Sequence, residues 1–265
     1  MDNVLPAALL ATTGTWLITA LGAATVLFFR RIRQETLNLM LGFAAGVMIA
    51  ASFWSLLQPA VELTERHLPI PAFLTVTGGF SGGVLFMWGA DRVITAIRRR
   101  TESAEGGSPS NRILLLVLSI TLHNIPEGLA VGVAFGALAG SGYSPEALMG
   151  AVTIAAGIGL QNFPEGAAVS LPLRREGCSR SRSFWIGQAS GLVEPLAGVA
   201  GAAAAVYMRR LLPFALSFAA GTMILVAVHE LIPECQQDKK AHPYRATMGV
   251  MGGFLLMTLL DLALG

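Results

Sequence analysis

Long apolar runs recur along the chain, and short polar breaks separate each run from the next. We identify eight of them, each long enough for the roughly 20 residues that a helix needs to cross a bilayer. They cover about residues 5–29, 36–61, 70–97, 112–138, 145–172, 183–206, 211–235 and 244–264. No run alternates apolar and polar residues at period two, which argues against a transmembrane β-barrel. The pattern predicts an all-α integral membrane protein, with eight transmembrane helices in one domain spanning residues 1–265.

The composition supports a lipid environment. Hydrophobic residues make up 54% of the chain and charged residues 13%, whereas soluble domains carry about 25% charged residues. The net charge is +2 and the basic residues lie in short scattered clusters, so a nucleic-acid partner is not expected. Two cysteines cannot form a disulfide framework. The lipid bilayer is therefore the partner that the composition predicts.

The distribution of Lys and Arg predicts the orientation. Fourteen of the 18 basic residues lie in the breaks 30–33, 98–112, 174–182 and 239–245, and three lie in the alternate breaks. Loops rich in Lys and Arg stay in the cytoplasm. We therefore expect a multi-pass protein of the cell membrane (plasma or inner membrane) with both termini outside the cytoplasm.

A nine-residue motif occurs twice, in the fourth and fifth runs. His123-Asn-Ile-Pro-Glu-Gly-Leu-Ala-Val131 and Gln161-Asn-Phe-Pro-Glu-Gly-Ala-Ala-Val169 share six of nine residues at an offset of 38. Consecutive membrane helices run in opposite directions, so this is an inverted repeat, which is a frequent plan in transporters.

Each copy brings metal ligands to one level of a helix. His123 and Glu127 are four residues apart and therefore share a face. Pro126 lacks an N–H, which bends the helix and leaves the carbonyl of Leu122 free. Gln161, Glu165, Pro164 and Leu160 repeat the arrangement. Mixed nitrogen and oxygen ligands of this kind suit Zn²⁺, Fe²⁺ and Mn²⁺.

Three carboxylates are expected at mid-membrane depth. Glu165, Glu194 and Glu127 lie nine, twelve and fifteen residues from the nearest cytoplasmic arginine, which places them in the middle third of a ~30 Å core. No Lys or Arg is expected beside them, and uncompensated charge at that depth is costly. A bound divalent cation would neutralise them. For Glu194 alone, a protonated or hydrogen-bonded carboxylate explains the sequence equally well.

Both motifs, together with Glu194 in Gly191-Leu-Val-Glu-Pro195, resemble those of the ZIP (Zrt/Irt-like) divalent metal transporters, and especially their prokaryotic GufA-like branch. Gly42–Met48 in the second run and His229-Glu230 in the seventh are similar to that family as well. The resemblance covers essentially the whole chain. It implies a 3+2+3 bundle in which helices 1–3 and 6–8 are inverted repeats around the 4–5 pair. It also implies that helices 1, 4, 5 and 6 move as a block against the other four.

The same resemblance implies a two-metal site between helices four and five. Its first ion would take His123, Glu127, Gln161 and Glu165, with Met48 as an added thioether, although a buried methionine is as often core. Its second ion would take Asn124, Glu127, Asn162, Glu165 and Glu194. Many relatives have Asp where this chain has Asn162, so we expect a weaker second site. The loop 98–111 contains no histidine, so metal sensing by that loop is not expected.

Other polar residues are candidates for the two ends of a pathway. Glu62 and Glu65 lie near the outer mouth, where they would attract cations or simply belong to a solvated loop. Asp91, His229 and Glu230 lie nearer the cytoplasmic ends of their helices and are candidates for an exit site, with an Asp91–Arg92 ion pair as the competing interpretation for Asp91. Asp261 is expected at the surface.

The leading interpretation is a transporter that imports divalent metal ions into the cytoplasm by alternating access, with zinc the first candidate and cadmium, iron and manganese the others. A metal-selective channel is the alternative. An intramembrane metalloenzyme is disfavoured because the chain has no H-E-x-x-H motif and no unligated glutamate to act as a base. We therefore expect no catalytic residues and no cofactor, with the metal as the transported substrate. The resemblance also allows a homodimer, and the sequence alone ranks neither the metals nor a coupling ion.

Overall fold

Helices account for nearly all of the computed structural model, which describes residues 3–29, 33–103, 109–141, 144–175, 177–236 and 244–264. The first four long helices are α1 (Val4–Phe28), α2 (Gln34–Ala51), α3 (Gln58–His67) and α4 (Ala72–Ser103). The next four are α5 (Pro109–Ser141), α6 (Pro145–Arg175), α7 (Arg180–Ala189) and α8 (Val193–Tyr207). The last are α9 (Leu212–Val226), α10 (Ile232–Gln236) and α11 (Tyr244–Leu264). The described residues contain no strand, in keeping with the predicted all-α fold.

Several of these helices join end to end into single rods. A π-helical segment, η1 (Ser52–Leu57), connects α2 to α3, and a second, η4 (Ala227–Leu231), connects α9 to α10. One 3₁₀ turn, η2 (Ser190–Leu192), connects α7 to α8, and another, η3 (Arg209–Leu211), precedes α9. Counted as rods, seven described stretches are long and apolar enough to cross a membrane. Helix α5 covers the remaining predicted run, 112–138.

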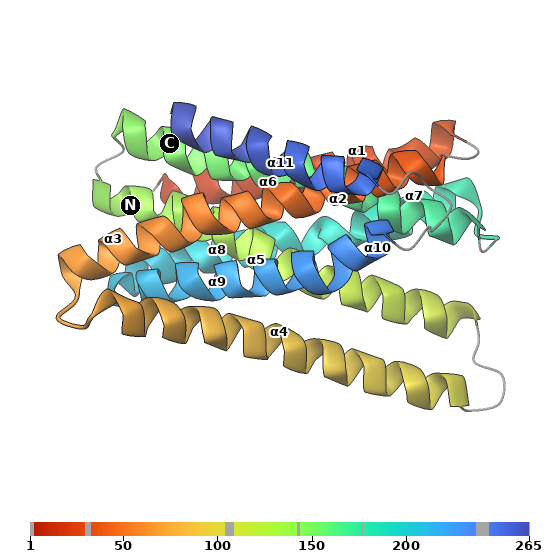
Figure 1. Ribbon diagram of the computed structural model, residues 1–265, viewed down its shortest axis with the longest axis horizontal. Coiled ribbons are helices and arrows are strands. Elements are labelled where there is room, and N and C mark those ends of the chain that lie inside the picture. The colour runs from red at the N-terminus through yellow and green to blue at the C-terminus, as the bar shows by residue number, and fades with distance from the viewer. Residues whose placement is uncertain are drawn as a thin grey trace.

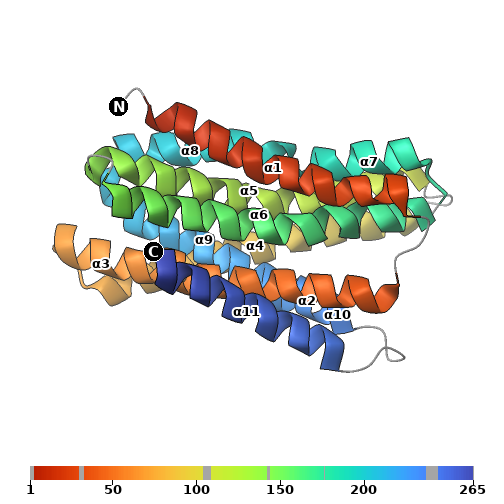
Figure 2. The same ribbon diagram turned by 90° about the horizontal axis from the view of Figure 1, so that it is seen from above.

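The rods divide into two groups. The motif group contains α1, α5, α6, α7 and α8, and the flanking group contains α2, α3, α4, α9, α10 and α11. The most extensive contacts pair α1 with α6 and α5 with α8 in the motif group, and α2 with α11 and α4 with α9 in the flanking group. Figure 2 shows the two groups side by side, and Figure 1 shows both chain termini at the same end of the bundle.

Glycines allow close backbone contact inside each of these four pairs. A Cβ at Gly22 would collide with the carbonyl of Phe163 on α6, and a Cβ at Gly132 with that of Gly198 on α8. Gly46 in α2 and Gly83 in α4 approach α11 and α9 in the same way. Gly157 of the motif group, by contrast, meets the flexible side chain of Met257 in the flanking group. Small residues let membrane helices approach closely, so each group is tightly packed within itself.

Two further repeats link helices of the flanking group. Phe-Ala-Ala-Gly-x-Met-Ile occurs at 43–49 in α2 and at 218–224 in α9. Each copy is followed by a π-helical segment and then by a proline, Pro59 or Pro233. Gly-x-x-Gly-Gly-x₃-Met-x₃-Asp occurs at 79–91 in α4 and at 249–261 in α11.

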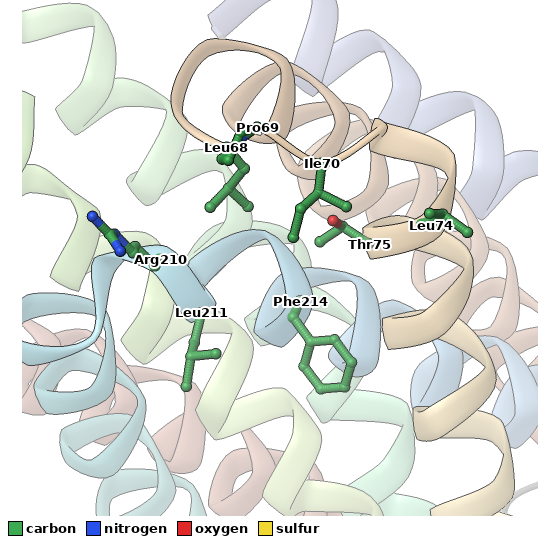
Figure 3. Close-up of a pocket in the computed structure, with 8 residues that line it drawn as sticks. All are labelled: Leu68, Pro69, Ile70, Leu74, Thr75, Arg210, Leu211 and Phe214. Atoms are coloured by element: carbon green, nitrogen blue, oxygen red, sulfur yellow. The ribbon is translucent and has the colours of Figure 1, made fainter.

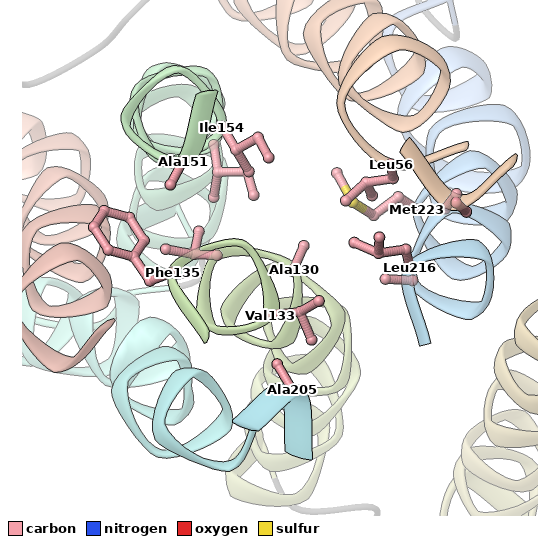
Figure 4. Close-up of a cluster of buried hydrophobic side chains, with 14 of the residues drawn as sticks. Leu56, Ala130, Val133, Phe135, Ala151, Ile154, Ala205, Leu216 and Met223 are labelled. Atoms are coloured by element: carbon pink, nitrogen blue, oxygen red, sulfur yellow. The ribbon is translucent and has the colours of Figure 1, made fainter. Parts of the chain in front are cut away.

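The largest apolar cluster lies where the two groups meet. Ala130 and Val133 on α5 face Leu56, Leu216 and Met223 of the flanking group (Figure 4). These α5 side chains are small and contain no polar atoms. Movement of α5 along this part of the interface would therefore break no hydrogen bond made by these side chains.

Candidate metal centre

The two copies of the motif lie in the middle of α5 and α6, within the motif group. Asn124, Glu127, Gln161 and Asn162 are buried, with at most 1% of each exposed, whereas His123 and Glu165 are half-buried. A proline lies inside each helix at this level, Pro126 in α5 and Pro164 in α6. The fold therefore brings both copies into the interior, where polar atoms need partners.

Several oxygen atoms of the motifs lack such partners. Gln161 Nε2 donates a hydrogen bond to Glu127 Oε1 and joins the two copies. Among the described residues, the buried carboxylate and amide oxygens without a hydrogen-bond partner all belong to the motifs: Asn124 Oδ1, Glu127 Oε2, Gln161 Oε1 and Asn162 Oδ1. The hydroxyls of Thr153, Ser183 and Thr258 are the other buried oxygens without a partner. A buried acceptor without a partner destabilises a fold by about 1–3 kcal/mol. A cation bound between the copies would take the place of missing hydrogen-bond donors.

Glu194, by contrast, has hydrogen-bond donors on both carboxylate oxygens. Oε2 accepts from Thr15 Oγ1 at 2.6 Å and from Asn162 Nδ2 at 2.9 Å, and Oε1 accepts from Thr19 Oγ1 at 3.3 Å. Asn162 Nδ2 also donates to the carbonyl of Thr15 at 3.2 Å. Both carboxylate oxygens of Glu194 are therefore hydrogen-bonded in this structure.

His123 turns toward the flanking group. Its Nε2 lies 2.9 Å from Glu230 Oε1 in the π-helical segment η4. This polar side-chain contact joins the two groups. It connects a predicted metal ligand to a predicted exit residue.

Carboxylates cluster around this level. Electrostatic repulsion acts on Glu127 from Glu165 and Glu194, and on Glu165 from Glu194 and Glu230. In the part of the chain that the structure describes, no three His, Cys, Asp or Glu side chains form a ready-made metal site. A site built from these residues must therefore include the amide oxygens of the motifs as well.

Met48 is buried in the main apolar cluster, together with Met223, its counterpart in the Phe-Ala-Ala-Gly-x-Met-Ile repeat. This environment accords with a core methionine.

Asp91 corrects one of our expectations. Its carboxylate pairs with His229, with Oδ2 3.9 Å from Nε2, rather than with Arg92. The Arg92 guanidinium instead stacks on the ring of Trp88, 4.7 Å from its centroid. Neighbouring residues on a helix point about 100° apart, so Asp91 and Arg92 face different surroundings. Asp91, Arg92 and His229 line a cavity of about 660 Å³.

Asp261 corrects another. It is half-buried rather than a surface residue, and Ser55 Oγ in η1 donates a hydrogen bond of 2.6 Å to its Oδ1. Asp261 and Asp91 occupy the same position in the glycine repeat of α11 and α4.

Glu62 and Glu65 are in α3, where Glu62 lies 3.6 Å from Arg66 in an exposed ion pair and Glu65 is exposed.

A cavity of about 580 Å³ at the turn between α3 and α4 lies away from the motifs. Figure 3 shows the apolar side chains of Ile70 and Phe214 facing the space, with the Arg210 guanidinium at one side. A cation on its wall repels metal ions, so this cavity does not match the chemistry of the centre.

Thr15, Thr19 and Ser55 are the polar partners that our sequence reasoning missed. The signal was available for the first two, because Thr12, Thr15 and Thr19 recur at helical spacing in an otherwise apolar run. Nothing in the local sequence indicated which carboxylates these hydroxyls meet.

Comparisons with known proteins identify the family of the chain. A family model described as ZIP Zinc transporter matches residues 100–261. The chain is 37% identical to zinc transporter GufA of Myxococcus xanthus over the full length of both. It is 38% identical to zinc transporter ZIP11 of Xenopus tropicalis over 97% of each chain. Zinc transporter ZIPB of Bordetella bronchiseptica is 39% identical over 93% of this chain and 78% of the relative.

Proposed function

The chain belongs to the ZIP family of zinc transporters, and from that premise we propose that it imports divalent metal ions, zinc first, through a site on α5 and α6. The family is one of transporters rather than enzymes, so the metalloenzyme alternative is set aside. Seven described helical stretches of the chain are long and apolar enough to cross a membrane, as expected of a multi-pass membrane protein.

The observation that carries this proposal is the group of unpartnered motif oxygens. Asn124, Glu127, Gln161 and Asn162 each keep an oxygen without a donor in the interior. Glu165 is the additional carboxylate at the same position of the second copy. Zn²⁺ and similar ions accept carboxylate and amide oxygens together with imidazole nitrogen, and His123 is the imidazole at hand.

In the proposed assignment, one ion takes His123, Glu127, Gln161 and Glu165, with Met48 as an optional neighbour. A second ion would draw on Asn124, Asn162 and Glu194 together with the two shared glutamates. If His123 binds the first ion through Nε2, it must leave Glu230. Loading would then remove this polar side-chain contact between the groups.

Alternating access follows as movement of the motif group against the flanking group. Glycine-mediated backbone packing inside each group favours two rigid bodies. The interface at Ala130 and Val133 is apolar and small, so it can slide without breaking hydrogen bonds. The division agrees with the block of helices 1, 4, 5 and 6 that the family resemblance implied.

The release route would run along the flanking group. Glu230 contacts His123, and its neighbour in the sequence, His229, contacts Asp91 at the 660 Å³ cavity. An ion released by His123 would meet these groups in that order. The outer carboxylates, Glu62, Glu65 and Asp261, are candidates for the opposite mouth.

The 3+2+3 plan is supported by the pairs of repeats. The Phe-Ala-Ala-Gly copies relate the second and seventh rods, and the glycine–aspartate copies relate the third and eighth.

The Lys and Arg count favours the end that contains residues 98–111 and 174–182 as the cytoplasmic one. In intact cells, cysteines introduced into these two segments should react only after the membrane is permeabilised. Labelling from outside would reverse the proposed direction.

The function is tested with purified protein in liposomes. We expect saturable zinc uptake that Glu165→Ala abolishes and that Glu146→Ala, an exposed carboxylate on the same helix, leaves intact. Zinc flux that rises without saturation and depends weakly on temperature would identify a channel instead. No metal flux in the wild-type liposomes would contradict the proposal.

A further inference from the structure

We propose that Thr15 and Thr19 of α1 are positioning residues that keep Glu194 from binding a second metal ion, so that the centre holds one ion tightly. This inference rests on the proposed metal centre and concerns its stoichiometry. It assigns a role to two threonines outside the duplicated motif.

The lone pairs of Glu194 carry the argument. A carboxylate offers about four acceptor positions, two on each oxygen. Oε2 uses both of its positions, for Thr15 Oγ1 and Asn162 Nδ2, and Oε1 uses one, for Thr19 Oγ1. Glu194 is fully buried, so water does not compete for the remaining position. A second ion would therefore find one free lone pair or would have to displace a donor.

Each of these threonine hydroxyls also has a backbone carbonyl of its own helix, one turn earlier, as an alternative acceptor. Thr12 takes it, since its Oγ1 donates to the carbonyl of Ala8 at 2.7 Å, as threonines in helices often do. Thr15 Oγ1 lies 2.6 Å from Glu194 but 3.0 Å from the carbonyl of Thr12. A hydroxyl has one proton, and the shorter, charge-assisted bond is the stronger. Thr19 Oγ1 lies 3.3 Å from Glu194 and 3.4 Å from the carbonyl of Thr15, so for Thr19 the charge of the carboxylate favours Glu194.

Glycine makes room for this arrangement. A Cβ at Gly191 would lie 3.0 Å from Glu194 Oε1 and 3.2 Å from Thr19 Cβ. Both distances are tighter than ordinary van der Waals contact, so a side chain at 191 would push the carboxylate and the threonine apart.

Asn162 completes the arrangement. Its two Nδ2 protons go to Glu194 and to the Thr15 carbonyl, so Thr15 holds both Glu194 and Asn162. The Asn162 amide donates hydrogen bonds at the place where a second cation would lie. Around Glu194, the donors Thr15, Thr19 and Asn162 therefore occupy acceptor positions that a second ion would need.

The test is isothermal titration of detergent-purified protein with Cd²⁺ or Zn²⁺, comparing isosteric and hydroxyl-retaining variants. We expect wild type to bind one ion tightly and Thr15→Val/Thr19→Val to bind a second ion at least about tenfold more tightly than wild type does. Thr15→Ser/Thr19→Ser keeps both hydroxyls and should restore the wild-type isotherm. Thr12→Val, on the same helix but bonded only to its own backbone, is the matched control and should not change the isotherm.

Should the double valine variant fail to fold, Thr15→Val alone frees one position on Oε2 and is expected to tighten the second ion in the same direction. Two ions bound equally tightly by wild type, or a second-ion affinity that is unchanged in the valine variants, would overturn this inference while leaving the first-ion site standing. An equal change in Thr12→Val would also overturn it. Absence of even the first ion in wild type would overturn the proposed centre itself.

Discussion

The two copies of the motif share six of nine residues but have different partners in the fold. In the α5 copy, His123 reaches out of its own group to Glu230 in the flanking group. In the α6 copy, Asn162 stays inside the motif group, bonded to Glu194 and to the backbone of Thr15. One bond between the copies, from Gln161 to Glu127, joins them.

This difference suggests different roles for the two copies if the groups move against each other as proposed. A residue that bonds across the interface between the groups can respond to their relative movement. One that bonds only within its group keeps its geometry during that movement. Under that proposal the α5 copy would couple metal binding to motion, and the α6 copy would hold the site together.

The largest effect is expected from the carboxylates that the two copies share. Glu127→Ala or Glu165→Ala should reduce zinc uptake by about 100-fold or more, because each removes a charged ligand from every ion in the centre. The measurement is uptake into liposomes, with membrane insertion checked by protein yield. If one variant retained wild-type uptake, the copies would not contribute equally and the shared-ligand assignment would be wrong.

Substitution of the first residue of each copy, His123 or Gln161, should lower transport to different extents. His123→Ala is expected to lower transport by at least about tenfold, since His123 is the imidazole of the first-ion site and the link to Glu230. Gln161→Ala removes one amide ligand and should lower transport only several-fold. Equal losses in the two variants, measured as initial rates, would remove the distinction drawn here.

Stability should distinguish packing within a group from packing between groups. Gly132→Ala forces a methyl group into the backbone of α8 and should destabilise the protein by about 1–3 kcal/mol. Gly157→Ala meets the flexible Met257 side chain and should be milder. Gly78 has open space around it, so Gly78→Ala should be neutral or slightly stabilising. Thermal unfolding in detergent gives this ranking, and a reversal of the first two would argue against two rigid groups.

Asn162→Asp tests whether the charge at this position of the α6 copy controls binding of the second ion. Two divalent ions carry four positive charges and Glu127, Glu165 and Glu194 supply three negative ones, so an added carboxylate balances the loaded centre. We expect second-ion binding to tighten by roughly tenfold, with slower release. An unchanged titration curve would show that charge at 162 does not control occupancy.

Glu230→Gln should have the smallest effect, because glutamine still hydrogen bonds to His123. Loss of its charge weakens the hold on His123, so the apparent KM for zinc should fall about two- to fivefold, with a lower maximal rate. Glu234→Gln, an exposed carboxylate on the neighbouring α10, is the control. A higher KM in Glu230→Gln alone would instead assign Glu230 a part in recruiting metal.

Much of this molecule follows from its sequence, because hydropathy and helix spacing are local properties. The eight apolar runs correspond to the described rods and α5, and the duplicated motif identifies the residues that lie together in the interior. The partners of these residues are not local. The His123–Glu230, Thr15–Glu194 and Ser55–Asp261 contacts depend on which helices pack together and at what height. The Asp91–Arg92 interpretation was wrong because proximity in sequence is not proximity on a helix face.

The two π-helical segments have a consequence for how the repeated halves diverged in length. The copies in α2 and α9 align at an offset of 175 residues up to Ile49 and Ile224, but their prolines, Pro59 and Pro233, align at 174. The segment η1 has six residues and η4 has five. An extra residue in a regular α-helix would rotate everything beyond it by about 100°, whereas a wider turn absorbs it locally. The π-helical segments therefore make a single-residue insertion or deletion tolerable in the middle of a membrane span, where a change of length ordinarily disrupts the packing of a helix.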